Sequence, residues 1–166
     1  MKLEGLGLVN STTSSGIDIL EKNIQVWCKT FKGDQFQFQA KKNAEQNLMS
    51  AIEELDKSTD PKSVDLLLKL LEDCRAGSDL YGKAVSTLVK KGDSIIPRLA
   101  KYLDYHLRSM NVQFTIPFIL AEIGGEKAIE MLLSEATSAR STQPGRDSLP
   151  YRAIIFNLLR QITKRN

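Results

Sequence analysis

The feature that most constrains the fold is a helix-start phrase that recurs about every 32 residues in the second half of the chain. Its three copies begin at Asp60, Gly92 and Gly124, and apolar residues at helical spacing follow each of them. When the sequence is aligned with itself at an offset of 32 residues, Leu88 aligns with Leu120, and these two leucines precede the second and third copies. A period between about 20 and 50 residues is typical of repeat proteins, in which each unit buries its apolar face against its neighbours. The sequence therefore predicts stacked helical units from residue 60 onward.

Each unit is predicted to be a pair of antiparallel helices, because two apolar periodic segments lie within each period. The predicted helices cover residues 62–74 with 79–91, 94–105 with 107–123, and 127–137 with 150–162. The segment at 138–149 is the longest break between them and is expected to be a long loop.

The helix predicted over 107–123 carries two apolar stripes rather than one. They consist of Met110, Phe114, Phe118 and Ala121, and of Val112, Ile116, Ile119 and Ile123. A surface helix needs only one such stripe, so this helix is expected to lie in the middle of the stack. A narrow polar stripe remains for a partner. Pro117 lies inside this helix, where proline normally kinks the backbone.

The chain before residue 60 is predicted to form a lead segment over 1–16 and an N-terminal helical pair or cap over 17–58. Apolar residues recur at helical spacing from Ile17 to Phe31 and again from Ala40 to Leu55. Between them the strict alternation from Gln35 to Gln39 is a strand signal, so a β-hairpin is the alternative for residues 24–39. Residues 60–166 form the repeat region, and the whole chain is expected to be one structural domain.

Composition and charge exclude several classes of protein. With 42% hydrophobic and 26% charged residues the chain resembles an average globular domain. The net charge of +3 is too small to indicate nucleic-acid binding by itself, although basic residues gather after Arg140. Cys28 and Cys74 form no CxxC motif and only His106 accompanies them, so we expect free buried thiols and no metal site. Neither a signal peptide nor a membrane span is expected, and a reducing cytoplasm fits the free thiols.

The phrase from Leu88 to Leu99, echoed from Leu120 to Ile129, resembles the junction between consecutive HEAT and HEAT-like repeats, including the phycobilin-lyase type. The resemblance covers about residues 60–162. It implies an all-α fold, a right-handed α-α superhelix that forms a short HEAT-like solenoid of about three helix pairs. Proteins of this architecture, which is armadillo-like, commonly act as adaptors or scaffolds. In such proteins the second helix of each pair generally lines the concave side.

No catalytic constellation emerges from the sequence, and no cofactor is expected. His106 is the only histidine, and no nucleophile motif accompanies it. The polar residues on the second helix of each predicted pair are instead candidate partner-binding residues. They are Lys83, Thr87 and Lys90 in the first unit, Arg108, Asn111, Thr115 and Glu122 in the second, and Arg152, Asn157, Arg160 and Lys164 in the third.

Three hypotheses for function follow. The first is a non-catalytic protein-binding adaptor whose concave face holds an acidic or mixed-charge segment of another protein. The second is nucleic-acid binding, because HEAT-like folds include DNA glycosylases and the C-terminal basic cluster is able to neutralise phosphates. The third, implied only by the phycobilin-lyase resemblance, is a role with bilin-bearing subunits. The first is favoured, because the net charge is modest and no residue set for glycosylase or bilin chemistry is found.

Overall fold

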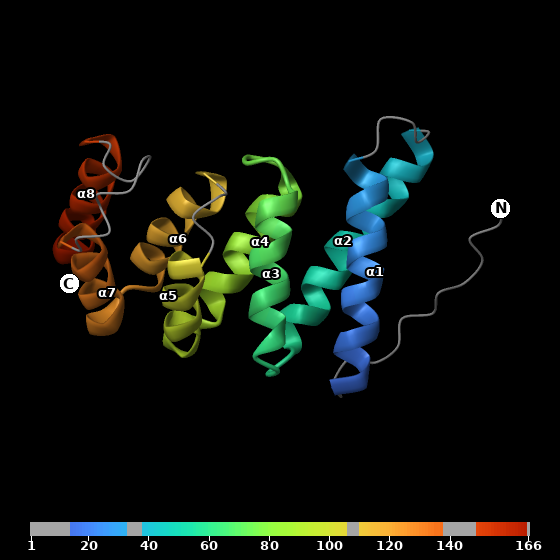
Figure 1. Ribbon diagram of the computed structural model, residues 1–166, viewed down its shortest axis with the longest axis horizontal. Coiled ribbons are helices and arrows are strands. Elements are labelled where there is room, and N and C mark those ends of the chain that lie inside the picture. The colour runs from blue at the N-terminus through green and yellow to red at the C-terminus, as the bar shows by residue number, and fades with distance from the viewer. Residues whose placement is uncertain (1–13, 33–37, 106–109, 138–148, 166) are drawn as a thin grey trace.

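The residues that the structure describes form an all-helical fold (Figure 1). The structure is a computed structural model that describes residues 14–32, 38–105, 110–137 and 149–165. Eight α-helices and one short 3₁₀-helix make up this part of the chain. Most of the alternation that suggested a β-hairpin lies outside the described residues, whereas residues 24–32, before it, are helical. None of the described helices combines the length and apolar character needed to cross a bilayer.

The helix boundaries agree closely with the apolar periodicity of the sequence. In chain order the elements are α1 (Ser14–Lys32), α2 (Phe38–Lys57), α3 (Lys62–Asp73), α4 (Asp79–Lys90), the 3₁₀-helix η1 (Gly92–Ile95), α5 (Ile96–Tyr105), α6 (Met110–Ile123), α7 (Gly125–Thr137) and α8 (Leu149–Arg165).

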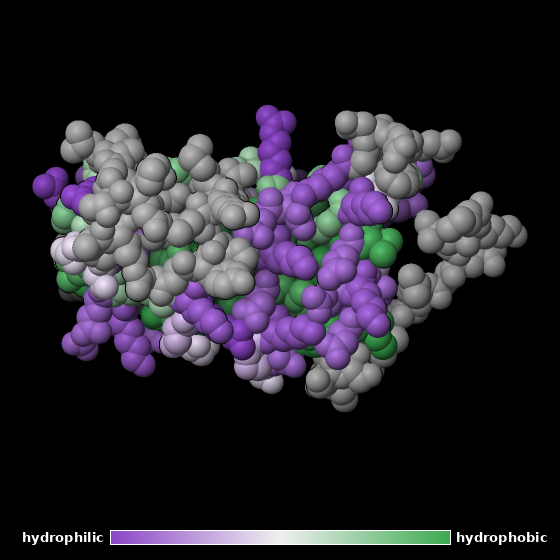
Figure 2. Space-filling model, in the orientation of Figure 1, coloured by the Kyte–Doolittle hydropathy of each residue, from purple (hydrophilic) through white to green (hydrophobic). Residues whose placement is uncertain are grey.

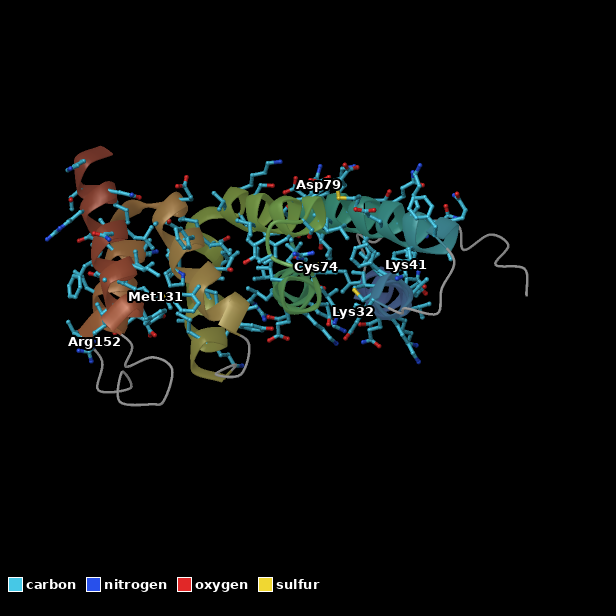
Figure 3. All side chains as sticks on the ribbon, turned by 90° about the horizontal axis from the view of Figure 1, so that it is seen from above. Lys32, Lys41, Cys74, Asp79, Met131 and Arg152 are labelled. Carbon is cyan, nitrogen blue, oxygen red and sulfur yellow. The ribbon has the colours of Figure 1, made fainter. Side chains whose placement is uncertain are left out.

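The helices pack in sequential pairs that lie in two layers. Each odd helix contacts the even helix that follows it: α1 with α2, α3 with α4, α5 with α6, and α7 with α8. The even helices also contact one another in order, α2 with α4, α4 with α6 and α6 with α8. Figure 1 shows the pairs following one another along the long axis, and Figure 3 shows α2 and α4 lying over α1 and α3. One continuous apolar core, from Ile17 to Ile162, runs between the layers.

Helix α6 lies in the middle of this arrangement. It contacts α3, α4, α5, α7 and α8, and its residues Val112, Ile116 and Ile119 are at most 1% exposed. The prediction that this helix is covered on more than one side is therefore confirmed. Its narrow polar stripe is open only in part among the described side chains, because Thr115 is buried whereas Glu122 is exposed; Phe118 also reaches the surface.

Two glycines one repeat apart end the helices α4 and α6. Gly92 has φ +62° and Gly124 has φ +69°, both in the left-handed region that side chains with a Cβ rarely adopt. The Gly124 amide donates to the carbonyl oxygen of Leu120 at 2.9 Å, which closes the last turn of α6. This backbone requirement explains why glycine recurs at these two positions.

The first copy of the phrase uses a different device, since it has aspartate in place of glycine. Asp60 accepts a hydrogen bond from the Lys62 amide through its Oδ1 atom at 2.8 Å and so caps the start of α3. In the second copy the predicted helix start at Ser94 is wrong, because Ser94 belongs to η1 and α5 begins at Ile96. Pro97 then lies in the first turn of α5, where its missing N–H is not needed.

Polar ties between successive pairs differ in the number of residues that they span. The ion pairs of α1 with α3 join residues 41 to 44 positions apart, whereas four other ties span about one sequence repeat. They join residues 30 to 34 positions apart: Lys83 with Glu53, Lys90 with Asp56, Arg98 with Asp65, and Tyr81 with Thr115. Each tie links one helix to the helix two further along the chain. Equivalent positions of neighbouring units therefore face one another.

Candidate partner-binding surface

The first part of the predicted surface, on α4, is electrically neutralised by α2. Lys83 Nζ lies 3.1 Å from Glu53 Oε1, and Lys90 Nζ lies 3.4 Å from Asp56 Oδ2. These exposed pairs contribute little to stability, but they satisfy both lysines within the chain. Thr87, between them on the helix, is 1% exposed. The α4 portion therefore offers a partner no excess of positive charge.

The second part, on α6, is smaller than the sequence indicated. Thr115 is 7% exposed, and its hydroxyl forms a hydrogen bond with Tyr81 Oη of α4. Glu122 is exposed on the same helix. Arg108 lies outside the described residues, as does the side chain of Asn111.

Thr87 and Thr115 thus require a correction, because their side chains are enclosed between helices rather than presented on an open face. Threonine suits such a position, since its methyl group packs among apolar residues while its hydroxyl bonds locally. The sequence pattern placed both residues on polar stripes and so could not show that a neighbouring helix covers them.

The third part, on α8, carries the exposed cations. Arg152, Asn157, Arg160 and Lys164 are all exposed, and Figure 3 shows Arg152 on the helix that closes the C-terminal end of the row. The segment from Leu149 to Arg165 contains no acidic residue. In the part of the chain that the structure describes, no carboxylate lies within ion-pair distance of Arg160 or Lys164. The positive charge of the predicted surface is therefore concentrated here.

An exposed aromatic side chain completes this surface and was missed from the sequence. Phe156 is 47% exposed and lies one helical turn from Arg152 and one from Arg160. Arg152, Phe156, Arg160 and Lys164 therefore follow one another at intervals of four residues, and we call these four residues the α8 stripe. The spacing was visible in the sequence, but it did not show that the phenylalanine faces outward.

The buried side of α8 fixes the direction in which the α8 stripe points. Tyr151 is 2% exposed, and its ring meets that of Phe114 edge to face with centroids 5.5 Å apart. Its hydroxyl donates a hydrogen bond to Glu135 Oε1 of α7 at 3.1 Å. Contacts with both α6 and α7 thus hold α8 in one rotational setting.

The hydropathy of the molecular surface is mixed rather than uniformly polar. On the part of the face in Figure 2 that is not grey, hydrophilic side chains predominate and apolar side chains are visible between them. Besides Phe156, the large exposed apolar residues include Phe118 on α6 and Leu133 on α7. Aromatic and arginine side chains are the types enriched at the energetic centres of protein interfaces.

The two cysteines lie in the core rather than on this surface. Cys28 on α1 and Cys74 at the end of α3 are free thiols, 5% and 4% exposed. Burial raises the pKa of Cys28 to about 12 and that of Cys74 to about 11, and the Asp73 carboxylate adds to both shifts. Both remain protonated at neutral pH. His106 lies outside the described residues, among which no group of acidic, cysteine and histidine side chains is arranged to hold a metal ion.

In comparisons with known proteins, the chain matches no family model, no curated protein and no solved structure. Three cations and one aromatic ring make up the α8 stripe, and the segment from Leu149 to Arg165 contains no acidic residue.

Proposed function

We propose that the chain is a non-catalytic interaction module, a short HEAT-like α-solenoid that binds an acidic or mixed-charge segment of another protein. The proposal supposes that the pairs form a right-handed superhelix whose even helices line the concave side. It is supported by the two layers of helices and by the polar ties at 30 to 34 residues, since a solenoid unit contacts chiefly its neighbours.

The observation that carries the binding role is the α8 stripe. Its cations attract an acidic segment over a distance set by the salt concentration, which raises the rate of encounter. The half-exposed ring of Phe156 supplies apolar area that a partner desolvates on binding. Lys83 and Lys90 are already paired with carboxylates of α2, so the binding surface is centred on α8 rather than spread evenly along the even layer.

A binding measurement with a defined probe tests this function. The probe is a fluorescently labelled, glutamate-rich peptide that contains one aromatic residue, and its affinity is measured by anisotropy at low and moderate salt. The double variant Arg160→Glu/Lys164→Glu is expected to weaken binding by about tenfold or more, and Phe156→Ala by about fivefold.

A matched control changes net charge equally elsewhere. Lys101 of α5 and Lys127 of α7 are exposed lysines on the odd helices, so Lys101→Glu/Lys127→Glu is expected to leave the affinity nearly unchanged. Equal losses in the two double variants would show a general charge effect and would contradict the assignment to α8.

Nucleic-acid binding is the second candidate, and the same α8 cations are the observation that favours it. Phosphates attract such a cluster strongly, and their binding falls steeply as salt rises because counterions are released. Duplex DNA therefore forms a second arm of the titration. Retention of DNA with a steep salt dependence, together with no binding of the acidic peptide, would replace the protein-binding proposal with this one.

A further inference from the structure

A cavity lies at the junction of the first and second repeat pairs, remote in the sequence from the α8 stripe. It has a volume of about 510 Å³, within the range of small-molecule sites. On one side it is lined by the connection from α2 to α3, residues 58–61, and by the first turn of α3. The end of α4, η1 and the start of α5 line the other side. The two walls therefore come from consecutive copies of the repeat.

One wall contains a buried hydroxyl group with no hydrogen-bond partner. Ser63, in the first turn of α3, lines the cavity and is 1% exposed. Its Oγ atom is the only buried side-chain oxygen or nitrogen without a partner among the residues that the structure describes. Such atoms are rare in folded proteins, because an unpaired buried hydroxyl loses its bonds to water without replacement. A bound group that reaches this hydroxyl would supply its missing hydrogen bond.

Lys91 belongs to the opposite wall and extends its ammonium group to the connection from α2 to α3. Lys91 Nζ donates to the main-chain carbonyl oxygens of Ser58 at 2.8 Å and Asp56 at 3.5 Å. In the described part of the chain, no carboxylate lies within ion-pair distance of this ammonium. Burial lowers the pKa of Lys91, and the more distant Asp56 carboxylate only partly offsets the effect. An ammonium group has three donors, so one is available after the two carbonyls are bound.

Apart from Lys57, which is exposed, the other charged groups of the cavity are already engaged. Lys90 pairs with Asp56, and Arg98 donates to both oxygens of Asp65 at 2.6 and 2.7 Å. The first amides of α3 are also occupied, because the Lys62 amide binds Asp60 Oδ1 and the Ser63 amide binds the Asp60 carbonyl. The start of α3 is therefore not the anchor. Lys91 and Ser63 are therefore the candidate anchors.

The lining carries an excess of positive charge. The four cations Lys57, Lys90, Lys91 and Arg98 face the two carboxylates of Asp56 and Asp60. Asp65, which pairs with Arg98 from outside the lining, reduces the local excess from +2 to +1. A phosphate monoester carries about −1.5 to −2 near neutral pH and offers three acceptor oxygens, whereas a carboxylate carries −1 and offers two.

We infer that this cavity binds the phosphate group of a small phosphorylated molecule, with the Lys91 ammonium and the Ser63 hydroxyl as its hydrogen-bond donors. The bound oxygens would complete the bonding of both groups at once, and the negative charge would lie beside the local excess of positive charge. The hydroxyls of Ser58, Thr59 and Ser94 around the same cavity suit a polar remainder of the ligand. This inference does not depend on the proposed function of the α8 stripe.

The test uses inorganic orthophosphate as the probe and the full chain as the sample. Thermal unfolding is followed as phosphate is raised at constant ionic strength, with acetate and chloride in parallel arms. A ligand that binds only the folded state raises the melting temperature roughly in proportion to ln(1 + [L]/Kd), so the wild-type melting temperature is expected to rise with the logarithm of the phosphate concentration above Kd, and to do so with phosphate alone. An equal rise with acetate would overturn the assignment to phosphate.

Variants of the two donors sharpen the test. Lys91→Met is expected to weaken phosphate binding by about tenfold or more, because it removes the charged donor. Lys83→Met, which removes a lysine that is paired with Glu53 and lies outside the cavity, is the matched control and should bind as the wild type does. Equal phosphate affinity in Lys91→Met and the wild type would refute the site.

Ser63→Ala separates a ligand role from a purely structural one, and it also serves if Lys91→Met fails to fold. Without phosphate this variant is expected to melt at or above the wild-type temperature, because the unpaired hydroxyl is gone. With phosphate it is expected to gain less than the wild type. A variant that is less stable without phosphate and gains as much as the wild type on its addition would show that the hydroxyl serves the fold alone.

Discussion

The hydroxyl groups of Tyr81 and Thr115 form a hydrogen bond that joins α4 to α6 across two consecutive helix pairs. The two residues are 34 positions apart in the sequence, which is about one repeat. Thr115 is buried, so this bond lies in a setting where neutral hydrogen bonds retain most of their strength.

A double-mutant cycle measures this link between the pairs. Tyr81→Phe and Thr115→Val each remove one hydroxyl while keeping most of the volume, and each is expected to lower the free energy of unfolding by about 1 kcal/mol. The loss in the double variant should be smaller than the sum of the two single losses by at least about 0.5 kcal/mol, because the bond is lost only once. Chemical denaturation provides the four values. Strict additivity would show that the two hydroxyls are not energetically coupled.

Neighbouring residues of α6 should respond very differently to truncation. Ile119 is 0% exposed, and Ile119→Ala is expected to lower the free energy of unfolding by about 2 to 4 kcal/mol, since it leaves a cavity in the core. Phe118 is 48% exposed, and Phe118→Ala is expected to cost about 1 kcal/mol or less. Urea denaturation of both variants compares the two positions. Similar losses at the two positions would contradict the rotational setting of α6.

The two buried thiols should make the chain less stable in alkali. In the unfolded chain thiols ionise near pH 8.5, whereas in the folded chain the pKa of Cys28 is about 12 and that of Cys74 about 11. Between these values the unfolded state binds fewer protons than the folded state, so the free energy of unfolding falls as the pH rises. The expected loss at about pH 10 is about 2 kcal/mol for each thiol.

The control for this prediction is the double variant Cys28→Ala/Cys74→Ala, unfolded by urea at pH 7.5 and at about pH 10 with reductant present. It is expected to be less stable than the wild type at neutral pH, because two core side chains are smaller. Its further loss on raising the pH should be smaller than that of the wild type, because the thiol contribution is absent. The loss that remains comes from lysines and tyrosines, which titrate in both proteins. Parallel losses would show that the thiols are accessible to ionisation in the folded state.

Destabilisation at one end of the row should stay near that end. The main contacts of α1 and α2 are with each other and with α3 and α4. Leu48 of α2 is 0% exposed, so Leu48→Ala is expected to reduce amide-exchange protection in α1 and α2 by tenfold or more. Protection in α7 and α8 should change much less, as in a chain whose units couple to their neighbours. A uniform reduction along the chain would indicate a single cooperative unit.

The pairing of helices was predictable because the apolar spacing and the residues that end helices indicate the same boundaries. Gly92 and Gly124 mark helix ends through a backbone conformation that glycine adopts most easily, and that requirement is local. The start of α5 was predicted too early, since the sequence does not distinguish a 3₁₀ turn at Ser94 from the first turn of an α-helix.

The surface was less predictable, because exposure depends on neighbours that are distant in sequence. Thr87 and Thr115 occupy polar stripes in the sequence, yet both are enclosed. The ion pairs of Lys83 and Lys90 were not foreseen either, since their carboxylates lie on α2, which precedes the recognisable repeats. The resemblance to HEAT-like repeats and a role with bilin-bearing subunits both stay predictions.

The interval of about one repeat between bonded partners bears on how a chain of this kind can change in length. Arg98 reaches back 33 residues to Asp65, and Lys90 reaches back 34 residues to Asp56. Donor and acceptor therefore occupy equivalent positions of neighbouring segments, and an exact duplicate of that size would place one arginine opposite another and one lysine opposite another. Growth by tandem copying thus requires a change of charge at each seam, and inserting a few residues within a helix would displace each donor from its acceptor.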